Sequence, residues 1–330
     1  MRTVRWGILG LGSIANKFAS DLLLVPNTEL IAVASSDYRR AEAFSEKYSS
    51  KRFYDSYQSL FDDSDVEIIY IASLHPKHAE LSIAALKHRK AVLCEKPLAM
   101  NEQEVKAMIS ASHSTNVFLM EGLWTRFNPS FQQAQDWIKE GKLGRLRYIN
   151  ATFSFNGLDR GPDSRLFHPD KGGGTLLDIG IYPLFLAYQL LGKPKNIQAS
   201  AHLTAHGVDQ QLAILLTYEN AHAVLYSSFA HNEVMSATIA GEEGEIYMDS
   251  RWHETPKLSL VKGEEMVSEA FDFIGKGYSY EIEEASQCIR EGKKESAKWS
   301  LDSSLELMQL MDSIRQLCGI HYPSDRNEKK

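Results

Sequence analysis

The first third of the chain alternates short apolar runs with amphipathic stretches, and no other feature restricts its fold as strongly. The apolar runs predict buried strands, and the stretches between them predict helices. The predicted strands are Val4–Leu9, Leu30–Ala34, Ile68–Ile71, Ala91–Cys94 and Val117–Met120, and the predicted helices are Ser13–Leu24, Arg39–Tyr48, His78–His88 and Val105–Ser114. Strands that alternate with helices form right-handed crossovers and a parallel sheet covered on both faces. The sequence therefore predicts an α/β fold with a doubly wound parallel sheet in residues 1–122.

Beyond residue 122, predicted strands follow one another without helices between them. The predicted strands are Arg147–Phe155, Asn196–His202, Gln210–Tyr218, Ala221–Phe229 and Ser236–Ala240, and the predicted helices are Pro129–Glu140, Leu177–Leu191, Ser279–Glu291 and Ser303–Leu317. Consecutive strands without crossover helices pair in antiparallel fashion. We therefore expect residues 123–330 to form an α+β domain with a large, mostly antiparallel sheet.

Length and composition exclude several classes of protein. A chain of 330 residues suggests two domains. Its net charge of −7 comes without a basic stripe, which argues against a nucleic-acid-binding protein. The three cysteines are widely spaced and odd in number, so we expect a reduced compartment rather than a disulfide framework. We see neither a signal peptide nor an apolar run of membrane-spanning length, so we expect a cytoplasmic protein without a membrane partner.

A glycine-rich turn joins the first predicted strand to the first predicted helix. Residues Gly10–Ala15 have the pattern G-x-G-x-x-A. Gly10 suits a tight turn, Gly12 permits close approach of a pyrophosphate, and the helix N-terminus supplies oriented N–H groups. The pattern stands where the dinucleotide-binding fingerprint of a Rossmann domain requires it. We expect a dinucleotide cofactor, with an ordinary structural turn as the alternative.

The end of the second predicted strand bears on the choice of cofactor. An acidic residue there would bind the ribose hydroxyls of NAD, but this chain has Ser35 and Ser36. Hydroxyl groups leave room for a 2′-phosphate, and Arg39 or Arg40 could pair with it. We therefore favour NADP. NAD stays open through the nearby Asp37, and the two arginines could also form a solvated helix face.

Two further segments carry side chains suited to proton chemistry. Lys96 and Pro97 follow the fourth predicted strand, at the sheet edge where ligands of open α/β folds bind. Asp178 and Tyr182, separated by four residues, follow the triple glycine Gly172–Gly174 and share one helical face. An ammonium such as that of Lys96 makes a phenolate more accessible, so that Tyr182 can exchange a proton with a substrate hydroxyl. The alternatives are a surface Glu-Lys pair, an Asp favoured by the helix dipole, and a packed tyrosine.

These motifs together resemble the Gfo/Idh/MocA family of NAD(P)-dependent oxidoreductases. Gly10–Ala15, Glu95–Pro97 and Gly172–Tyr182 occur in the order and at the separations typical of that family. The segment Phe118–Phe127, with Leu177–Tyr182, is most similar to the branch of dimeric dihydrodiol dehydrogenases and NADP-dependent D-xylose 1-dehydrogenases. Substrates in the family are mostly sugars and polyols, and this branch also oxidises trans-dihydrodiols.

The resemblance implies a role for each matching residue. Lys96 would be the active-site lysine, Tyr182 the acid/base, and Asp178 its acidic partner. Residues implied to surround the cofactor are Gly10, Leu11, Gly12, Ser13, Ile14, Ser73, Leu74, His75, His78 and Glu95. Residues implied to wall the nicotinamide and substrate pocket are Trp124, Arg126, Phe153 and Trp252. Ser36 departs from the branch, which often has Arg there, and this departure weakens the expectation of NADP unless Arg39 or Arg40 substitutes.

We therefore expect a metal-free hydride transfer between the nicotinamide and a carbinol carbon of a sugar, polyol or trans-dihydrodiol. His75 and His78 lack the further carboxylate or cysteine ligands that a metal site needs. The alternative is a catalytically silent protein that senses a cofactor or a sugar on the same fold. The resemblance also implies a homodimer formed through the C-terminal sheet, with packing of its apolar residues on helices of their own domain as the alternative.

Overall fold

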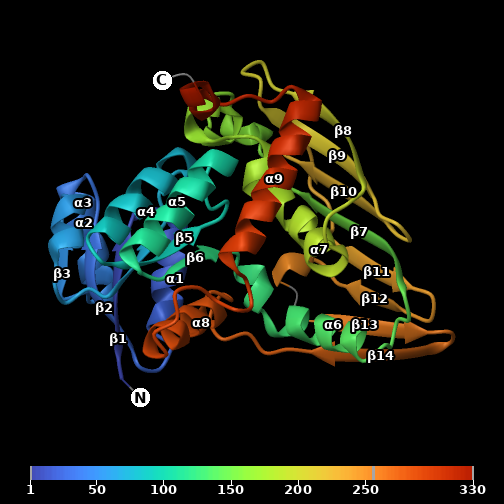
Figure 1. Ribbon diagram of the computed structural model, residues 1–330, viewed down its shortest axis with the longest axis horizontal. Coiled ribbons are helices and arrows are strands. Elements are labelled where there is room, and N and C mark those ends of the chain that lie inside the picture. The colour runs from blue at the N-terminus through green and yellow to red at the C-terminus, as the bar shows by residue number, and fades with distance from the viewer. Residues whose placement is uncertain (1, 255–256, 329–330) are drawn as a thin grey trace. The chain divides into compact units, whose positions relative to one another are not determined.

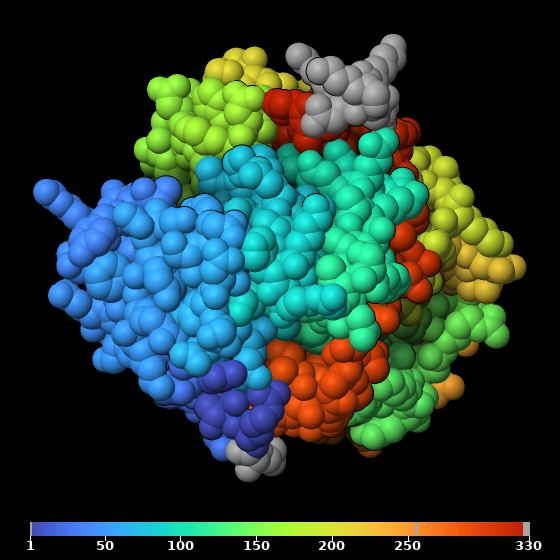
Figure 2. All heavy atoms as spheres, turned by 60° about the vertical axis from the view of Figure 1, so that its left-hand side comes forward, coloured from blue at the N-terminus to red at the C-terminus, as the bar shows by residue number. Residues whose placement is uncertain are grey.

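The chain divides into two compact units in a computed structural model that describes residues 2–254 and 257–328 (Figure 1). One unit comprises Met1–Phe127 with Phe273–Glu306, and the other comprises Asn128–Asp272 with Leu307–Lys330. These units differ from the two contiguous segments, 1–122 and 123–330, expected from the sequence. The reason is that a later segment packs with the first unit, and Figure 2 shows this orange segment set beside the blue and teal residues.

The first unit is built on a six-stranded parallel sheet in the order β3-β2-β1-β4-β5-β6. Its strands are β1 (Val4–Leu9), β2 (Thr28–Ala34), β3 (Arg52–Tyr54), β4 (Ile68–Ile71), β5 (Ala91–Glu95) and β6 (Leu119–Gly122). Its helices are α1 (Ser13–Leu22), α2 (Tyr38–Tyr48), α3 (Tyr57–Asp62), α4 (His78–Lys87), α5 (Glu102–Thr115) and α8 (Ser279–Arg290). The predicted doubly wound sheet is confirmed. The prediction missed β3 and α3, because both are too short to show a period.

The second unit is built on an eight-stranded sheet in the order β14-β13-β12-β11-β7-β10-β9-β8. Its strands are β7 (Leu146–Ser154), β8 (Asn196–Leu203), β9 (Asp209–Thr217), β10 (His222–Ser228), β11 (Ala237–Gly241), β12 (Glu245–Met248), β13 (Lys257–Lys262) and β14 (Glu265–Ala270). All neighbours pair antiparallel except β7 and β10, which are parallel. The expected mostly antiparallel sheet is therefore confirmed.

Helix α7 (Ile181–Leu191) covers one face of this sheet, against β7 and β10 (Figure 1). A π-helical turn, Leu176–Gly180, precedes it directly. By length and composition alone the stretch Pro169–Leu191 could cross a membrane, but 72% of its most apolar window is buried inside the protein, as in the core helix of a globular domain. The unit also contains α6 (Pro129–Lys139) and the later part of α9 (Leu301–Cys318). The sheet core therefore lies against the π-helical turn and the helix that together carry two of the predicted site residues, Asp178 and Tyr182.

Candidate functional site

The glycine turn after β1 is closed on one side and open on the other. Gly10 has a φ of +85°, and a Cβ there would lie 2.7 Å from the backbone of Ala72 and Ser73. At Gly12, by contrast, no heavy atom of the described chain beyond its immediate neighbours in sequence lies within 4 Å of the position that a Cβ would occupy. Helix α1 begins at Ser13, and no side chain of the described chain caps it. An open glycine at an uncapped helix N-terminus fits a pyrophosphate, so Gly10–Ile14 suit a dinucleotide.

Local hydrogen bonds occupy the acidic side chain at the end of β2. Asp37 caps α2 by accepting the backbone N–H of Arg40 at 2.9 Å, and its own N–H donates to Oγ of the buried Ser35. Ser36, Arg39 and Arg40 are exposed. Neither arginine makes an ion pair with any residue that the structure describes. These hydroxyls and guanidinium groups therefore suit a phosphate better than the engaged Asp37 suits a ribose diol.

The segment after β4 is fastened to the turn that contains Lys96. The ring of His78 is fully buried; its Nδ1 lies 2.8 Å from Pro97 O and its Nε2 lies 3.1 Å from Ser73 O. Burial lowers the pKa of His78 to about 4, so the ring is neutral at physiological pH. His75 is also buried, whereas Leu74 is exposed. His78, expected to line the cofactor pocket, thus lies in the interior and joins two loops.

Buried carboxyl groups surround the base of the Lys96 turn within the first unit. Glu95 accepts a hydrogen bond from the phenol of Tyr70, and burial raises the pKa of the Glu95 carboxyl. Glu121 accepts the N–H of Leu98 at 2.8 Å and the indole N–H of Trp299 at 3.0 Å. Glu95 therefore braces the end of β5 from within the protein, and Lys96 is the half-buried member of this segment.

A further buried carboxyl group of the first unit is that of Glu281. Glu281 in α8 is fully buried, and neither of its oxygens has a hydrogen-bond partner among the residues that the structure describes. Burial, together with the charges of Glu95 and Asp21, holds the pKa of Glu281 well above its usual value. Burial without a hydrogen-bond partner therefore favours the protonated form of Glu281.

Two residues predicted to wall the pocket are anchored inside the first unit. Trp124 stacks on Tyr278 with ring centroids 5.0 Å apart, and it is 5% exposed. Arg126 donates from Nε to Lys298 O at 2.8 Å, and burial lowers the pKa of its guanidinium to about 10. Both side chains are thus held in fixed orientations by the segment that returns to this unit.

The triple glycine of the second unit is tightly packed rather than flexible. A Cβ on Gly173 would lie 2.6 Å from the carbonyl oxygens of Arg165 and Leu166. Gly174 has a φ of +105°, and a Cβ there would lie 2.4 Å from Oδ1 of Asp209. Gly173 and Gly174 are therefore glycines because other parts of the protein approach them closely.

Asp178 and Tyr182 follow this glycine segment on successive helical turns. Oδ1 of Asp178 lies 3.3 Å from both terminal nitrogens of Arg165. The Tyr182 ring centroid lies 5.5 Å from that of Phe153 and 5.3 Å from that of His253. Phe153 and His253 are stacked at 4.2 Å. Asp178, Tyr182 and Phe153 thus lie in one unit, with a phenol set among aromatic rings.

Trp252, also predicted to wall the pocket, lies in the interior of the second unit. It is 1% exposed, and its indole N–H donates to Thr152 O at 2.8 Å. Its neighbour His253 is the residue that meets Phe153 and Tyr182. That Trp252 lines the substrate pocket stays a prediction. The side chain that contacts the Tyr182 ring is that of His253.

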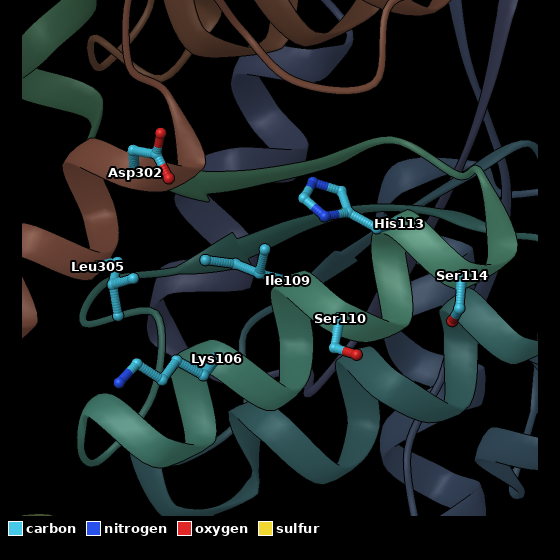
Figure 3. A pocket seen from close by; sticks show the side chains of 7 residues that line it. All are labelled: Lys106, Ile109, Ser110, His113, Ser114, Asp302 and Leu305. Carbon is cyan, nitrogen blue, oxygen red and sulfur yellow. The ribbon is translucent and has the colours of Figure 1, made fainter.

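A hollow elsewhere in the first unit contains none of the predicted site residues. It measures about 570 Å³ and lies between α5 and the start of α9 (Figure 3). Its lining residues are Lys106, Ile109, Ser110, His113, Ser114, Asp302 and Leu305. Across residues 2–254 and 257–328, no three His, Cys, Asp or Glu side chains are grouped so as to hold a metal ion.

Comparison with known proteins identifies the family. A model of the oxidoreductase family with an NAD-binding Rossmann fold matches residues 4–123, and a model of the GFO/IDH/MocA C-terminal domain matches residues 131–247. The chain belongs to the Gfo/Idh/MocA family. The trans-1,2-dihydrobenzene-1,2-diol dehydrogenase of Mus musculus is 34% identical over 335 residues, which cover 98% of this chain and 99% of that protein.

Solved structures resemble this Gfo/Idh/MocA protein over nearly its whole length. KijD10, a 3-ketoreductase from Actinomadura kijaniata in complex with NADP and TDP-benzene, is 25% identical with a TM-score of 0.85, covering 96% of this chain and 98% of its own. Levoglucosan dehydrogenase, in complex with NADH and levoglucosan, shares the fold at 20% identity with a TM-score of 0.87 and the same coverage. The protein is thus an NAD(P)-dependent oxidoreductase acting on CH–OH groups, as the sequence predicted.

Sequence reasoning missed several residues that lie beside the predicted site residues within one unit or the other. Arg165 and His253 contact predicted site residues, and Asp209 and Glu281 are buried next to the segments that carry them. His253 could have been suspected because it follows Trp252 directly. The other three have no local signal, because they lie outside the motifs that contain the predicted residues.

Proposed function

We propose that this protein transfers hydride to or from a carbinol carbon of a trans-dihydrodiol, sugar or other cyclic polyol, with Tyr182 as the acid/base. The observation that carries the proposal is the setting of the Tyr182 phenol. Its ring lies among Phe153 and His253, one helical turn after an Asp178 that is paired with Arg165. The name of the mouse relative supports a dihydrodiol, and the levoglucosan and ketoreductase structures widen the class to sugars.

The bound dinucleotide supplies or accepts the hydride, and the protein's own residues bind and orient it. In this proposal Gly10–Ile14 hold the pyrophosphate, because Gly12 is open and α1 begins there without a cap. Ser36, Arg39 and Arg40 receive a 2′-phosphate, so NADP is preferred to NAD. The further cofactor contacts proposed are those of Ser35, Ser73, Leu74, His75, Glu95, Trp124 and Arg126. His78, which is buried, acts by fixing the Ser73 and Pro97 backbones.

Tyr182 removes the hydroxyl proton during oxidation and returns it during reduction. Lys96 holds the same hydroxyl and stabilises the developing alkoxide, a contribution of several kcal/mol, on the order of that of an oxyanion-hole donor. Asp178 orients a second substrate hydroxyl, and Arg165 holds the Asp178 carboxylate in place. Phe153, Trp124 and Trp252 supply apolar walls suited to a ring.

The second unit also carries a surface suited to self-association. On the face of its sheet away from α7, Tyr148, Val224 and Tyr247 are each 37–40% exposed on β7, β10 and β12. Apolar residues on an open sheet face favour a covering partner. We propose a homodimer formed through this face, in the cytoplasm.

The proposal is tested by cofactor titration followed by steady-state kinetics with trans-dihydrodiols, inositols and sugars. We expect tighter binding of NADPH than of NADH. Tyr182→Phe should lower kcat by about 10²–10⁴-fold, because the proton acceptor is lost while the ring remains. Lys96→Ala should reduce kcat far more than it weakens cofactor binding. A Tyr182→Phe enzyme with parental kcat would remove Tyr182 from the acid/base role, and cofactor binding without turnover of any compound would contradict the substrate class.

A further inference from the structure

A buried chain of hydrogen bonds lies at the start of the helical turn that carries Asp178. Ser227 donates from Oγ to Thr175 Oγ1 at 3.0 Å, and Thr175 Oγ1 donates to Asp209 Oδ2 at 2.6 Å. The same Asp209 oxygen accepts the backbone N–H of Leu176 at 2.7 Å. Ser227, Thr175 and Asp209 are each at most 2% exposed. We refer to these three residues as the Asp209 latch.

The latch ties two neighbouring strands to one turn of helix. Asp209 is the first residue of β9, and Ser227 lies near the end of β10, which pairs with β9. Asp209 holds the beginning of the π-helical turn through Leu176. Ser227 lies against the end of that turn, because a Cβ on Gly180 would be only 2.9 Å from its Oγ. The start of the turn is therefore hydrogen-bonded to the sheet, and its end packs closely against the sheet.

The hydrogen bond from Leu176 to Asp209 satisfies a group of this turn that would otherwise lack a partner. The first N–H groups of a helix lack intrahelical partners, and here Thr175, at the N-cap position, makes no side-chain cap of its own. A carboxylate from a distant strand takes that place, and it forms charge-assisted hydrogen bonds in a water-poor interior. A π-helical turn is also rare and is less stable than an α-helical one, so it persists where packing and hydrogen bonds hold it.

We propose that the Asp209 latch positions Asp178 and Tyr182 for the reaction by fixing the register of the π-helical turn. Asp178 lies within that turn, and Tyr182 is the second residue of α7, which continues from it. A change in register would rotate both side chains relative to the sheet that carries Phe153. Asp209, Thr175 and Ser227 are thus positioning residues that act through the backbone. This inference rests on the proposed function, in which Tyr182 and Asp178 bind the substrate.

The test compares Thr175→Val with Thr175→Ser in the full-length enzyme loaded with NADPH. Valine keeps the shape of threonine but removes the hydroxyl that links Ser227 to Asp209, whereas serine keeps the hydroxyl. We expect Thr175→Val to lower kcat by about tenfold or more, because small misplacements of reacting groups are costly. Thr175→Ser should stay within about threefold of the parent, and the Kd for NADPH should be unchanged in both. Ile239→Ala on β11, a buried residue outside the latch, is the control for a general loss of stability.

Each outcome decides for or against the latch. Parental kcat in a folded Thr175→Val enzyme, or an equal fall of kcat in Ile239→Ala at matched melting temperature, would overturn it. If Thr175→Val does not fold, Ser227→Ala takes its place, with a fall of about threefold or more in support and parental kcat against. Amide hydrogen exchange of peptides covering residues 174–182 needs no turnover, so faster exchange in the latch variants is expected even if Tyr182→Phe disproves the acid/base role. Unchanged exchange would refute the latch itself.

Discussion

The two glycine-rich segments of this protein have similar sequences but opposite surroundings. In the first unit, the space beside Gly12 contains no heavy atom of the described chain. In the second unit, the space beside Gly174 is filled by Oδ1 of Asp209 and the phenol of Tyr322, 2.4 and 2.9 Å from a would-be Cβ. The first segment leaves room for a ligand, and the second leaves room for the protein's own side chains. A glycine-rich loop before a helix therefore indicates close approach without indicating what approaches.

The largest effect that distinguishes the two segments is expected at Gly174. Gly174→Ala should destabilise the fold by about 4 kcal/mol or more, because it combines a left-handed backbone with overlap against a buried carboxylate. The matched control is Gly207→Ala, where φ is +81° but no heavy atom of the described chain lies within 4 Å. That control should lose about 1–2 kcal/mol through backbone strain alone. Thermal and urea unfolding measure both losses, and equal losses would show that Asp209 and Tyr322 move aside easily.

A different result is expected at Gly12, where cofactor affinity should fall and stability should not. Gly12→Asp places a favourable N-cap residue at the start of α1, so the free energy of unfolding should be unchanged or slightly higher. Its carboxylate would occupy the open space and repel a pyrophosphate, which should raise the Kd for NADPH about 100-fold, or about 2.7 kcal/mol. Gly12→Ser is the neutral control and should weaken binding less. Parental affinity in Gly12→Asp would place the pyrophosphate elsewhere.

The smallest effect concerns Asp209, the acid that lies beside Gly174 in the second glycine-rich segment. Burial raises the pKa of Asp209 to about 6, and the hydrogen bonds from Thr175 and from the N–H of Leu176 oppose this rise. The phenol of Tyr322 and the thiol of Cys318 lie nearby. The folded protein therefore takes up this proton before the unfolded chain does. The group stabilises the fold fully below its unfolded pKa, and that contribution is lost as the pH rises through about 6.

Asp209→Asn should remove this pH dependence. Between pH 7 and pH 5 the unfolding free energy of the parent should gain about 1.4 kcal/mol relative to that of the variant. Urea unfolding of both proteins at the two pH values measures the difference, in which the contributions of all other groups cancel. Parallel stability curves would mean that Asp209 titrates as an ordinary exposed carboxyl group.

Prediction from sequence succeeded where the signal is local. The first five buried runs and the helices between them were placed within a few residues, because a parallel sheet needs continuous apolar strands. The strands β12, β13 and β14 were missed: β14 reads Glu265–Ala270 and is mostly exposed, so it shows no buried run. The return of Phe273–Glu306 to the first unit was also missed, since no linker composition marks it.

The predicted site residues likewise divide into those with a local sequence signal and contacts that depend on tertiary packing. Spacing along the chain placed Gly10 and Gly12 at one helix start and put Asp178 and Tyr182 on successive turns. It could not reveal that Arg165 pairs with Asp178, that His253 rather than Trp252 meets the Tyr182 ring, or that His78 lies inside the protein. Each of these contacts joins segments whose approach depends on the packing of whole elements.

The sequence by itself determined the parallel sheet of the first unit and the class of cofactor. These follow from periodicity and spacing, which operate over one or two turns of chain. Only the tertiary structure decided which glycine is open and which is filled, because the Asp209 that lies beside Gly174 belongs to a strand 35 residues further along the chain. Burial in turn raises the pKa values of Asp209 and Glu281, and burial is a property of the packed fold rather than of any segment.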